Sequence, residues 1–152
     1  ALQGLTYANY KQFWDRTYYG GYKVVKNISR DINSLLLPKE NLHAWGFSVG
    51  LFYYMNRSPQ TGLIATWPFK VGPRAPQFFE KVQADLSDPP VDLMVIDPWF
   101  VKIIPDFESI LLNYQRFPDD KKYFPFELYY LKDSLLEQRL LNNLPLDKNG
   151  NR

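Results

Sequence analysis

The sequence predicts one α/β domain, a three-layer sandwich with a mostly parallel, Rossmann-like sheet that a last antiparallel strand can extend at its edge. Three observations lead to this fold class. The chain has 152 residues, which is the size of one domain. Segments with the apolar spacing of strands alternate with segments that have helical spacing, as in sheets covered by helices on both faces. The 12 prolines fall largely between these segments, where they interrupt helices and strands.

In the first half of the chain, apolar spacing indicates two helices and two strands. Val25, Ile28 and Ile32 recur at the helical period, and Pro38 follows the end of this pattern. Ser48 is a suitable N-cap for the next helix, because its hydroxyl can accept a hydrogen bond from an otherwise unpaired backbone N–H. The expected elements are a helix over 22–36, a strand over 42–47, a helix over 48–56 and a strand over 61–67.

In the second half, a nearly continuous apolar run at 92–97 is typical of a strand buried on both faces. Phe78, Phe79 and Val82 lie on one side of an amphipathic helix that precedes it. Gln115 and Arg116 can form an arm that adds an antiparallel edge to the sheet. The expected elements are a helix over 77–86, a strand over 92–97, a helix over 105–114, a strand over 123–131 and a short helix over 133–141.

The chain divides into one domain and two terminal segments. Residues 21–146 contain the α/β pattern, and residues 147–152 form a frayed tail. Aromatic rings are unusually common, with 11 Phe, 11 Tyr and 4 Trp, and several lie in residues 1–20. Tyr and Trp gather at membrane interfaces, so this segment is expected to lie next to a bilayer, although the same residues also serve ordinary protein interfaces.

Composition excludes several classes of function. Lys and Arg number 18 against 16 Asp and Glu, and a net charge of +2 gives no field that would attract nucleic acid. The absence of cysteine rules out disulfides, thiolate zinc sites and cysteine nucleophiles. A single histidine argues against a His-rich metal centre. We therefore expect no nucleic-acid partner, no metal site and no cofactor.

Residues 46–50 read Gly-Phe-Ser-Val-Gly, which fits the G-x-S-x-G nucleophile elbow at a strand-to-helix turn. This motif would make Ser48 an acyl-transfer nucleophile in a small hydrolase. That mechanism needs a histidine later in the chain, whereas the only histidine, His43, precedes Ser48 on the same expected strand. A tight turn with a capped helix is the preferred interpretation. The helix N-terminus at this turn could also bind an anion.

Ligands of open α/β sheets bind beyond the carboxyl ends of the strands. Ser48, Trp67, Asp97 and Trp99 follow the ends of expected strands, so they form a candidate rim for substrate binding. Tryptophan faces stack on the apolar faces of sugars, and a carboxylate can accept hydrogen bonds from hydroxyls. The alternative is that both tryptophans pack under proline-rich loops and that Asp97 caps the turn at Pro98.

Two stretches resemble the C-terminal soluble domain of GT-C membrane glycosyltransferases, the polyprenyl-phosphate-sugar-dependent mannosyltransferase and aminoarabinose-transferase-like proteins. The first stretch has a W-G-x-x-x-x-x-Y pattern followed by R-x-P-x-T. The second has L-x-x-x-P-P, a buried strand and a later aromatic strand. Gly62 departs from the family, where many members have a basic residue. The matching residues are Trp45, Gly46, Tyr53 or Tyr54, Arg57, Pro59, Thr61, Leu86, Pro89, Pro90, 93–96, Leu111 or Leu112, Tyr114 and 128–132.

The resemblance, which covers about residues 22–132, implies a noncatalytic domain on the extracytoplasmic face of the membrane, in the periplasm or at the cell exterior. In that family the catalytic acid and the lipid-phosphate contacts lie in the membrane portion, so no catalytic residue carries over to this chain. The implied partners are the membrane portion of the same polypeptide, joined through upstream transmembrane helices, and a glycan or lipid-linked sugar acceptor. Arg57 either contacts such a ligand or offsets the dipole of the helix that it follows.

The leading interpretation is therefore a noncatalytic accessory domain of a membrane glycosyltransferase that assists acceptor binding. The alternative is a free-standing carbohydrate-binding or protein-interaction module. In both cases the candidate ligand-binding residues are Ser48, Arg57, Trp67, Asp97 and Trp99.

Overall fold

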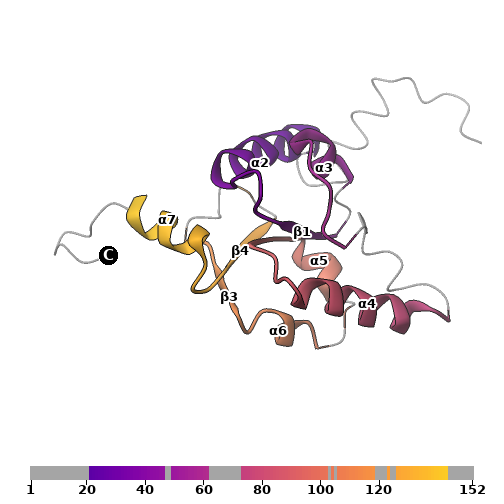
Figure 1. Ribbon diagram of the computed structural model, residues 1–152. Coiled ribbons are helices and arrows are strands. Elements are labelled where there is room, and N and C mark those ends of the chain that lie inside the picture. Colours follow the sequence, from indigo (N-terminus) through magenta and orange to yellow (C-terminus); the bar gives the residue numbers. More distant parts are fainter. Residues whose placement is uncertain are drawn as a thin grey trace, which may run out of the picture.

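A mixed sheet lies at the centre of the computed structural model, which describes residues 21–46, 49–61, 73–102, 104, 106–118, 123 and 126–143. Helices lie on both sides of this sheet (Figure 1). The strands of these residues are β1 (Leu42–Trp45), β2 (Leu93–Ile96), β3 (Tyr114–Arg116) and β4 (Glu127–Leu131). The helices are α2 (Gly21–Leu35), α3 (Val49–Met55), α4 (Ala75–Ser87), α5 (Pro98–Val101), α6 (Phe107–Ile110) and α7 (Leu135–Asn143).

The sheet of the described residues has the order β1-β2-β4-β3, with one parallel and two antiparallel pairs. The α/β class is thus confirmed, and the antiparallel edge strand exists as β3. The expectation of a mostly parallel sheet is wrong for this part of the chain. Strand β4 lies between β2 and β3 and pairs antiparallel with both of them, and only residues 117–126 separate it from β3. A parallel neighbour would need a crossover of a dozen or more residues at this point.

Strand β2 is buried on both faces, which explains its uninterrupted apolar sequence. Leu93 and Val95 point into a core cluster with residues of α2, α3 and α7, whereas Met94 and Ile96 point into a second cluster with residues of α4 and α6. In Figure 1, α2 and α3 lie together on one side of the sheet, and α4 and α6 lie on the other. Because successive side chains of a strand point to opposite faces of the sheet, the four residues of β2 contribute to both core clusters.

The expected helices over 22–36, 48–56 and 77–86 correspond to α2, α3 and α4. The expected helix over 105–114 is shorter, because only 107–110 is helical and Tyr114 already begins β3. Its early end has a physical reason. Tyr114 pairs with Leu131 of β4, so the chain must leave the helix before this residue, and the Tyr114 hydroxyl donates a further hydrogen bond to the Val91 carbonyl (3.0 Å).

Several predictions fall on residues that the structure does not describe. These are residues 62–67 of the strand expected over 61–67, the membrane-adjacent segment 1–20 and the tail 147–152. Among the described residues, every helix is too short or too polar to cross a bilayer.

Candidate functional site

The candidate rim lies where β1 and β2 end side by side, since Trp45 pairs with Ile96 in the sheet. Asp97 follows β2 and is buried, and its backbone N–H donates a hydrogen bond to the Trp45 carbonyl (2.9 Å). The backbone of Trp99 is part of helix α5, and the structure does not describe the Trp99 side chain. Ser48 and Trp67 also lie outside the described residues. Ligand binding by these four residues stays a prediction.

Gly46, the first glycine of the G-x-S-x-G motif, has a structural reason to be glycine. It follows β1 with φ of 133°, a conformation that side chains rarely adopt. Helix α3 begins three residues later, so the motif does occupy a strand-to-helix turn. The turn accounts for this glycine without any catalytic role.

The only histidine, His43, is part of the core. It lies in β1 with 2% of its surface exposed, and its ring makes an edge contact with the Trp45 ring at 4.6 Å between centroids. Its Nδ1 lies 3.4 Å from the Thr61 hydroxyl. Burial lowers the pKa of His43 to about 3, because the charged imidazolium would lose its hydration. His43 therefore stays neutral at physiological pH.

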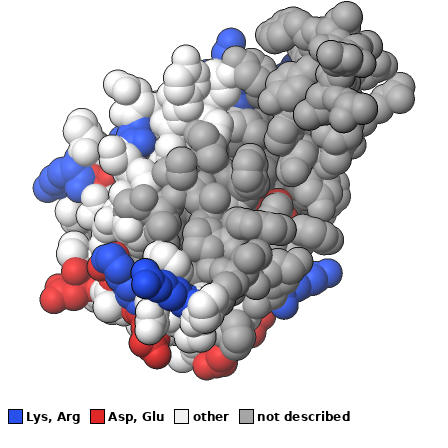
Figure 2. Space-filling view, turned by 90° about the vertical axis from the view of Figure 1, so that its right-hand side faces the viewer, with Lys and Arg blue, Asp and Glu red and all other residues white. Residues whose placement is uncertain are grey.

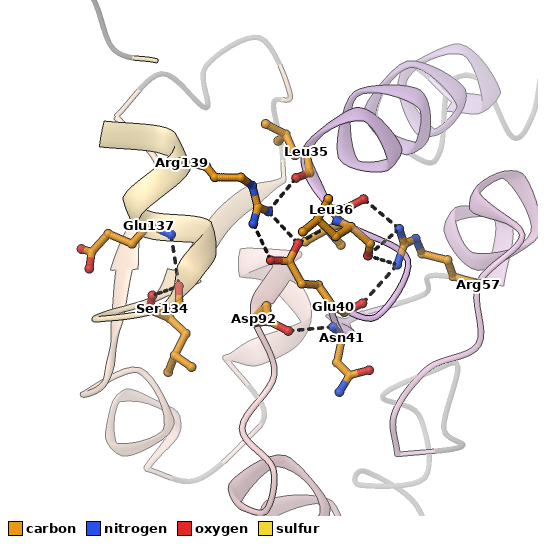
Figure 3. A network of polar contacts seen from close by, with 11 residues as sticks. Leu35, Leu36, Glu40, Asn41, Arg57, Asp92, Ser134, Glu137 and Arg139 are labelled. Carbon is orange, nitrogen blue, oxygen red and sulfur yellow. Dashed lines mark hydrogen bonds and ion pairs between the residues drawn. The ribbon is translucent and has the colours of Figure 1, made fainter. Parts of the chain in front are cut away.

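Arg57 closes the C-terminal end of α2. Its Nε donates to the Asn33 side-chain oxygen (3.0 Å), and its two NH groups donate to the carbonyls of Leu36, Leu37 and Glu40 at 3.0–3.3 Å (Figure 3). These are five hydrogen bonds, as many as a guanidinium has N–H donors. The carbonyls of Leu36 and Leu37 come directly after the last residue of α2, where the negative end of the helix dipole makes a cation favourable. Ligand contact by Arg57 stays a prediction, and it would require exchange of these bonds.

A partly buried ion pair continues this network to the last described helix. Arg139 of α7 binds both carboxylate oxygens of Glu40, at 2.7 and 2.6 Å, and also donates to the Leu35 carbonyl (3.1 Å) (Figure 3). The Glu40 side chain is only 5% exposed. The Leu37 backbone N–H donates to the same carboxylate at 2.7 Å. The pair thus fastens α7 to the loop after α2.

The protonation of Glu40 reflects two opposing influences. Burial raises the pKa of this carboxyl. The hydrogen bonds from Arg139 and the Leu37 N–H, together with the charges of Arg139 and Arg57, lower it by more. The pKa therefore lies below its ordinary value, and Glu40 is ionised at neutral pH.

Replacing Arg57 with lysine should lower the free energy of unfolding by about 2 kcal/mol, because an ammonium has three donors and cannot span the same acceptors. The matched control is Arg30→Lys. Arg30 is largely exposed and makes one surface contact with Asp31, so its loss should be below about 1 kcal/mol. Urea unfolding measures both variants. Equal losses would contradict the capping role of Arg57.

A groove of about 560 Å³ lies between α4, α6 and the β3–β4 hairpin, on the side of the sheet opposite α2 and α3 (Figure 1). Its volume falls within the range of small-molecule sites. The lining residues are Gln83, Leu86, Ser87, Pro90, Met94, Ser109, Ile110, Leu112, Asn113, Tyr114, Leu131, Lys132 and Asp133. Strand β2 contributes Met94, near its amino end, so the groove does not lie at the rim predicted from the sequence.

Sequence patterns did not indicate this groove. Gln83 and Ser87 lie on α4, Ser109 on α6 and Asn113 just before β3, and no motif joins them. Polar residues on amphipathic helices are usually solvated, so each of these residues, taken alone, indicates only a position exposed to solvent. Only the packing of α4 and α6 beside the hairpin brings them together.

On the described part of the face in Figure 2, basic and acidic side chains lie next to one another at the left and lower margins, and further charged side chains lie towards the top and the right. Among the described residues, no group of three or more His, Asp or Glu side chains is arranged to hold a metal ion.

No protein-family model, no curated protein and no solved structure matches this chain. The contacts described above and the sequence resemblance are thus the grounds for a functional proposal.

Proposed function

We propose that this chain is a noncatalytic domain of a membrane-bound GT-C glycosyltransferase. In this proposal, transmembrane helices upstream of residue 1 hold it on the extracytoplasmic face, in the periplasm or at the cell exterior. Its partners are the membrane portion of the same polypeptide and a glycan or lipid-linked sugar acceptor, which it helps to hold. The complete domain is proposed to be a three-layer sandwich, consistent with α2 and α3 on one side of the sheet and α4 and α6 on the other (Figure 1).

The observation that carries the proposal is the role of the residues on which the resemblance rests. Trp45 is buried and packs edge-on against the Phe107 ring at 5.2 Å between centroids. Arg57 caps α2, and the Thr61 hydroxyl lies beside His43. Trp45 thus joins β1 to α6, Arg57 joins the end of α3 to the loop after α2, and Thr61 lies against β1. A pattern with this structural role supports a likeness of architecture and a noncatalytic domain.

The sequence of the complete gene product tests this proposal most directly. We expect several apolar spans of about 20 residues each to precede residue 1. The full-length protein should remain with membranes after alkaline carbonate extraction, and a tag at its C-terminus should be accessible from outside intact cells. A gene product without such spans would overturn the proposal.

A free-standing carbohydrate-binding or protein-interaction module is the second candidate. The groove beside α4 and α6 favours the carbohydrate version, because it is the size of a small-molecule site. The two candidates differ in their surroundings. Sugar binding by a gene product that lacks membrane spans would support the free-standing module.

A further inference from the structure

We propose that the groove between α4, α6 and the β3–β4 hairpin binds a neutral, hydroxyl-rich ligand, namely a short glycan. This site is separate from the rim at the carboxyl ends of β1 and β2. The inference rests on the hydrogen-bonding groups that line the groove, and it does not depend on attachment of the chain to a membrane.

The hydroxyls along the groove have already used their protons. Ser87 donates to the Gln83 carbonyl (2.6 Å), and Ser109 donates to the Asp106 carbonyl (2.8 Å). Tyr114 donates to the Val91 carbonyl (3.0 Å). A hydroxyl has one proton and two acceptor lone pairs, so the exposed hydroxyls of Ser87 and Ser109 offer a ligand acceptors only. A ligand that binds them must therefore bring donors, such as hydroxyl groups.

Two amides complement these acceptors. In the part of the chain that the structure describes, the side chains of Gln83 and Asn113 have no hydrogen-bond partner, and both residues line the groove. A primary amide has two donors and a carbonyl acceptor. It therefore matches vicinal hydroxyls, which both donate and accept.

The charges at the groove favour a neutral ligand. Lys132 and Asp133 line one end, and their opposite charges cancel. The Lys132 ammonium also donates to the Leu112 carbonyl (2.7 Å), which holds it against the backbone. A phosphate or carboxylate would bring acceptors to a groove whose hydroxyls also offer acceptors. An anionic ligand is disfavoured for this reason.

The apolar part of the lining suits the remaining surface of a sugar. Leu86, Met94 and Ile110 belong to the core cluster under α4 and α6, or pack against it, and they also line the groove. Sugars combine hydroxyls with C–H faces that can cover such side chains. The mixed lining thus corresponds to the two kinds of surface on one molecule.

The test uses the purified chain with uncharged probes, methyl α-mannoside, methyl β-glucoside and methyl β-galactoside, and with inorganic phosphate for comparison. Saturation-transfer NMR detects binding, and amide chemical-shift titration gives the affinity and the location. We expect at least one methyl glycoside to bind and to shift amides of α4, α6 and the β3–β4 hairpin. The double variant Gln83→Ala/Asn113→Ala should bind it at least tenfold more weakly.

The matched control is Gln138→Ala, since Gln138 is an exposed amide on α7 outside the groove. It should bind like the unaltered chain, and thermal unfolding verifies that each variant is folded. Failure of every glycoside to bind would overturn the inference. So would shifts confined to the rim, unchanged affinity in the double variant, or tighter binding of phosphate at the groove. Because membrane attachment is read from the gene product, either proposal can fail while the other stands.

Discussion

Replacing Arg139 with methionine should lower the free energy of unfolding by about 3 kcal/mol. The variant leaves the Glu40 carboxylate, 5% exposed, without its bidentate partner. A buried charge that loses its counter-ion costs about 3–5 kcal/mol, and the lower end applies because a third of the Arg139 side chain is exposed. Chemical unfolding at neutral pH measures the effect.

Two further variants separate this loss from the removal of any surface arginine. Arg116→Met breaks an ion pair with Glu127 in which the arginine side chain is 50% exposed, so it should cost less than about 1 kcal/mol. The double variant Glu40→Gln/Arg139→Met removes both charges and should recover a large part of the loss. If Arg139→Met costs no more than Arg116→Met, the Glu40–Arg139 pair does not stabilise the fold as described.

The stability of the chain should fall steadily as pH decreases below 6.5. The folded state keeps His43 neutral down to a pKa of about 3, whereas the unfolded chain takes up this proton near 6.5. Protons therefore favour the unfolded state throughout this window, and the slope rises from about half of 1.4 kcal/mol per pH unit at pH 6.5 to nearly its full value below pH 5.5. Between pH 6.5 and 4.5 the loss should be about 2 kcal/mol, measured by urea unfolding at each pH.

The control for this prediction is His43→Asn, which keeps a polar side chain in β1 but does not titrate. Its stability should depend much less on pH between 6.5 and 4.5. Glu40 acts in a lower window, because its lowered pKa means that its contribution is present above about 4.5 and is lost as pH falls further. A pH slope unchanged by His43→Asn would contradict the buried, neutral histidine.

Local sequence pattern was enough to predict most of the described elements, but it could not predict how the strands pair. The apolar run at 93–96 indicated a doubly buried strand, and the spacing of Ile28 and Ile32 indicated the buried face of α2. The position of β4 between β2 and β3 depends on the direction in which a hairpin folds back. That direction follows from packing over many residues, and strands that alternate with helices appear the same in parallel and mixed sheets.

The site was harder to predict than the fold for a similar reason. The sequence pattern indicated a helix-dipole role for Arg57 at the end of its own helix, whereas its hydrogen bonds go to the end of α2, about 20 residues earlier. Its acceptors are mostly backbone carbonyls, which every residue has and no sequence pattern reports. The groove residues Ser109 and Asn113 are equally ordinary along the chain, and tertiary packing alone brings them beside α4.

The Glu40–Arg139 pair also has a consequence for biosynthesis. Arg57 finds its acceptors within 17 to 24 positions along the chain, so this cap can form soon after its residues leave the ribosome. Glu40 must wait for a partner 99 positions later. Until the segment containing Arg139 emerges, the carboxylate can avoid the cost of burial only by remaining in water. The layer that contains α2 is therefore completed only when α7 packs against residues that were translated 99 positions earlier.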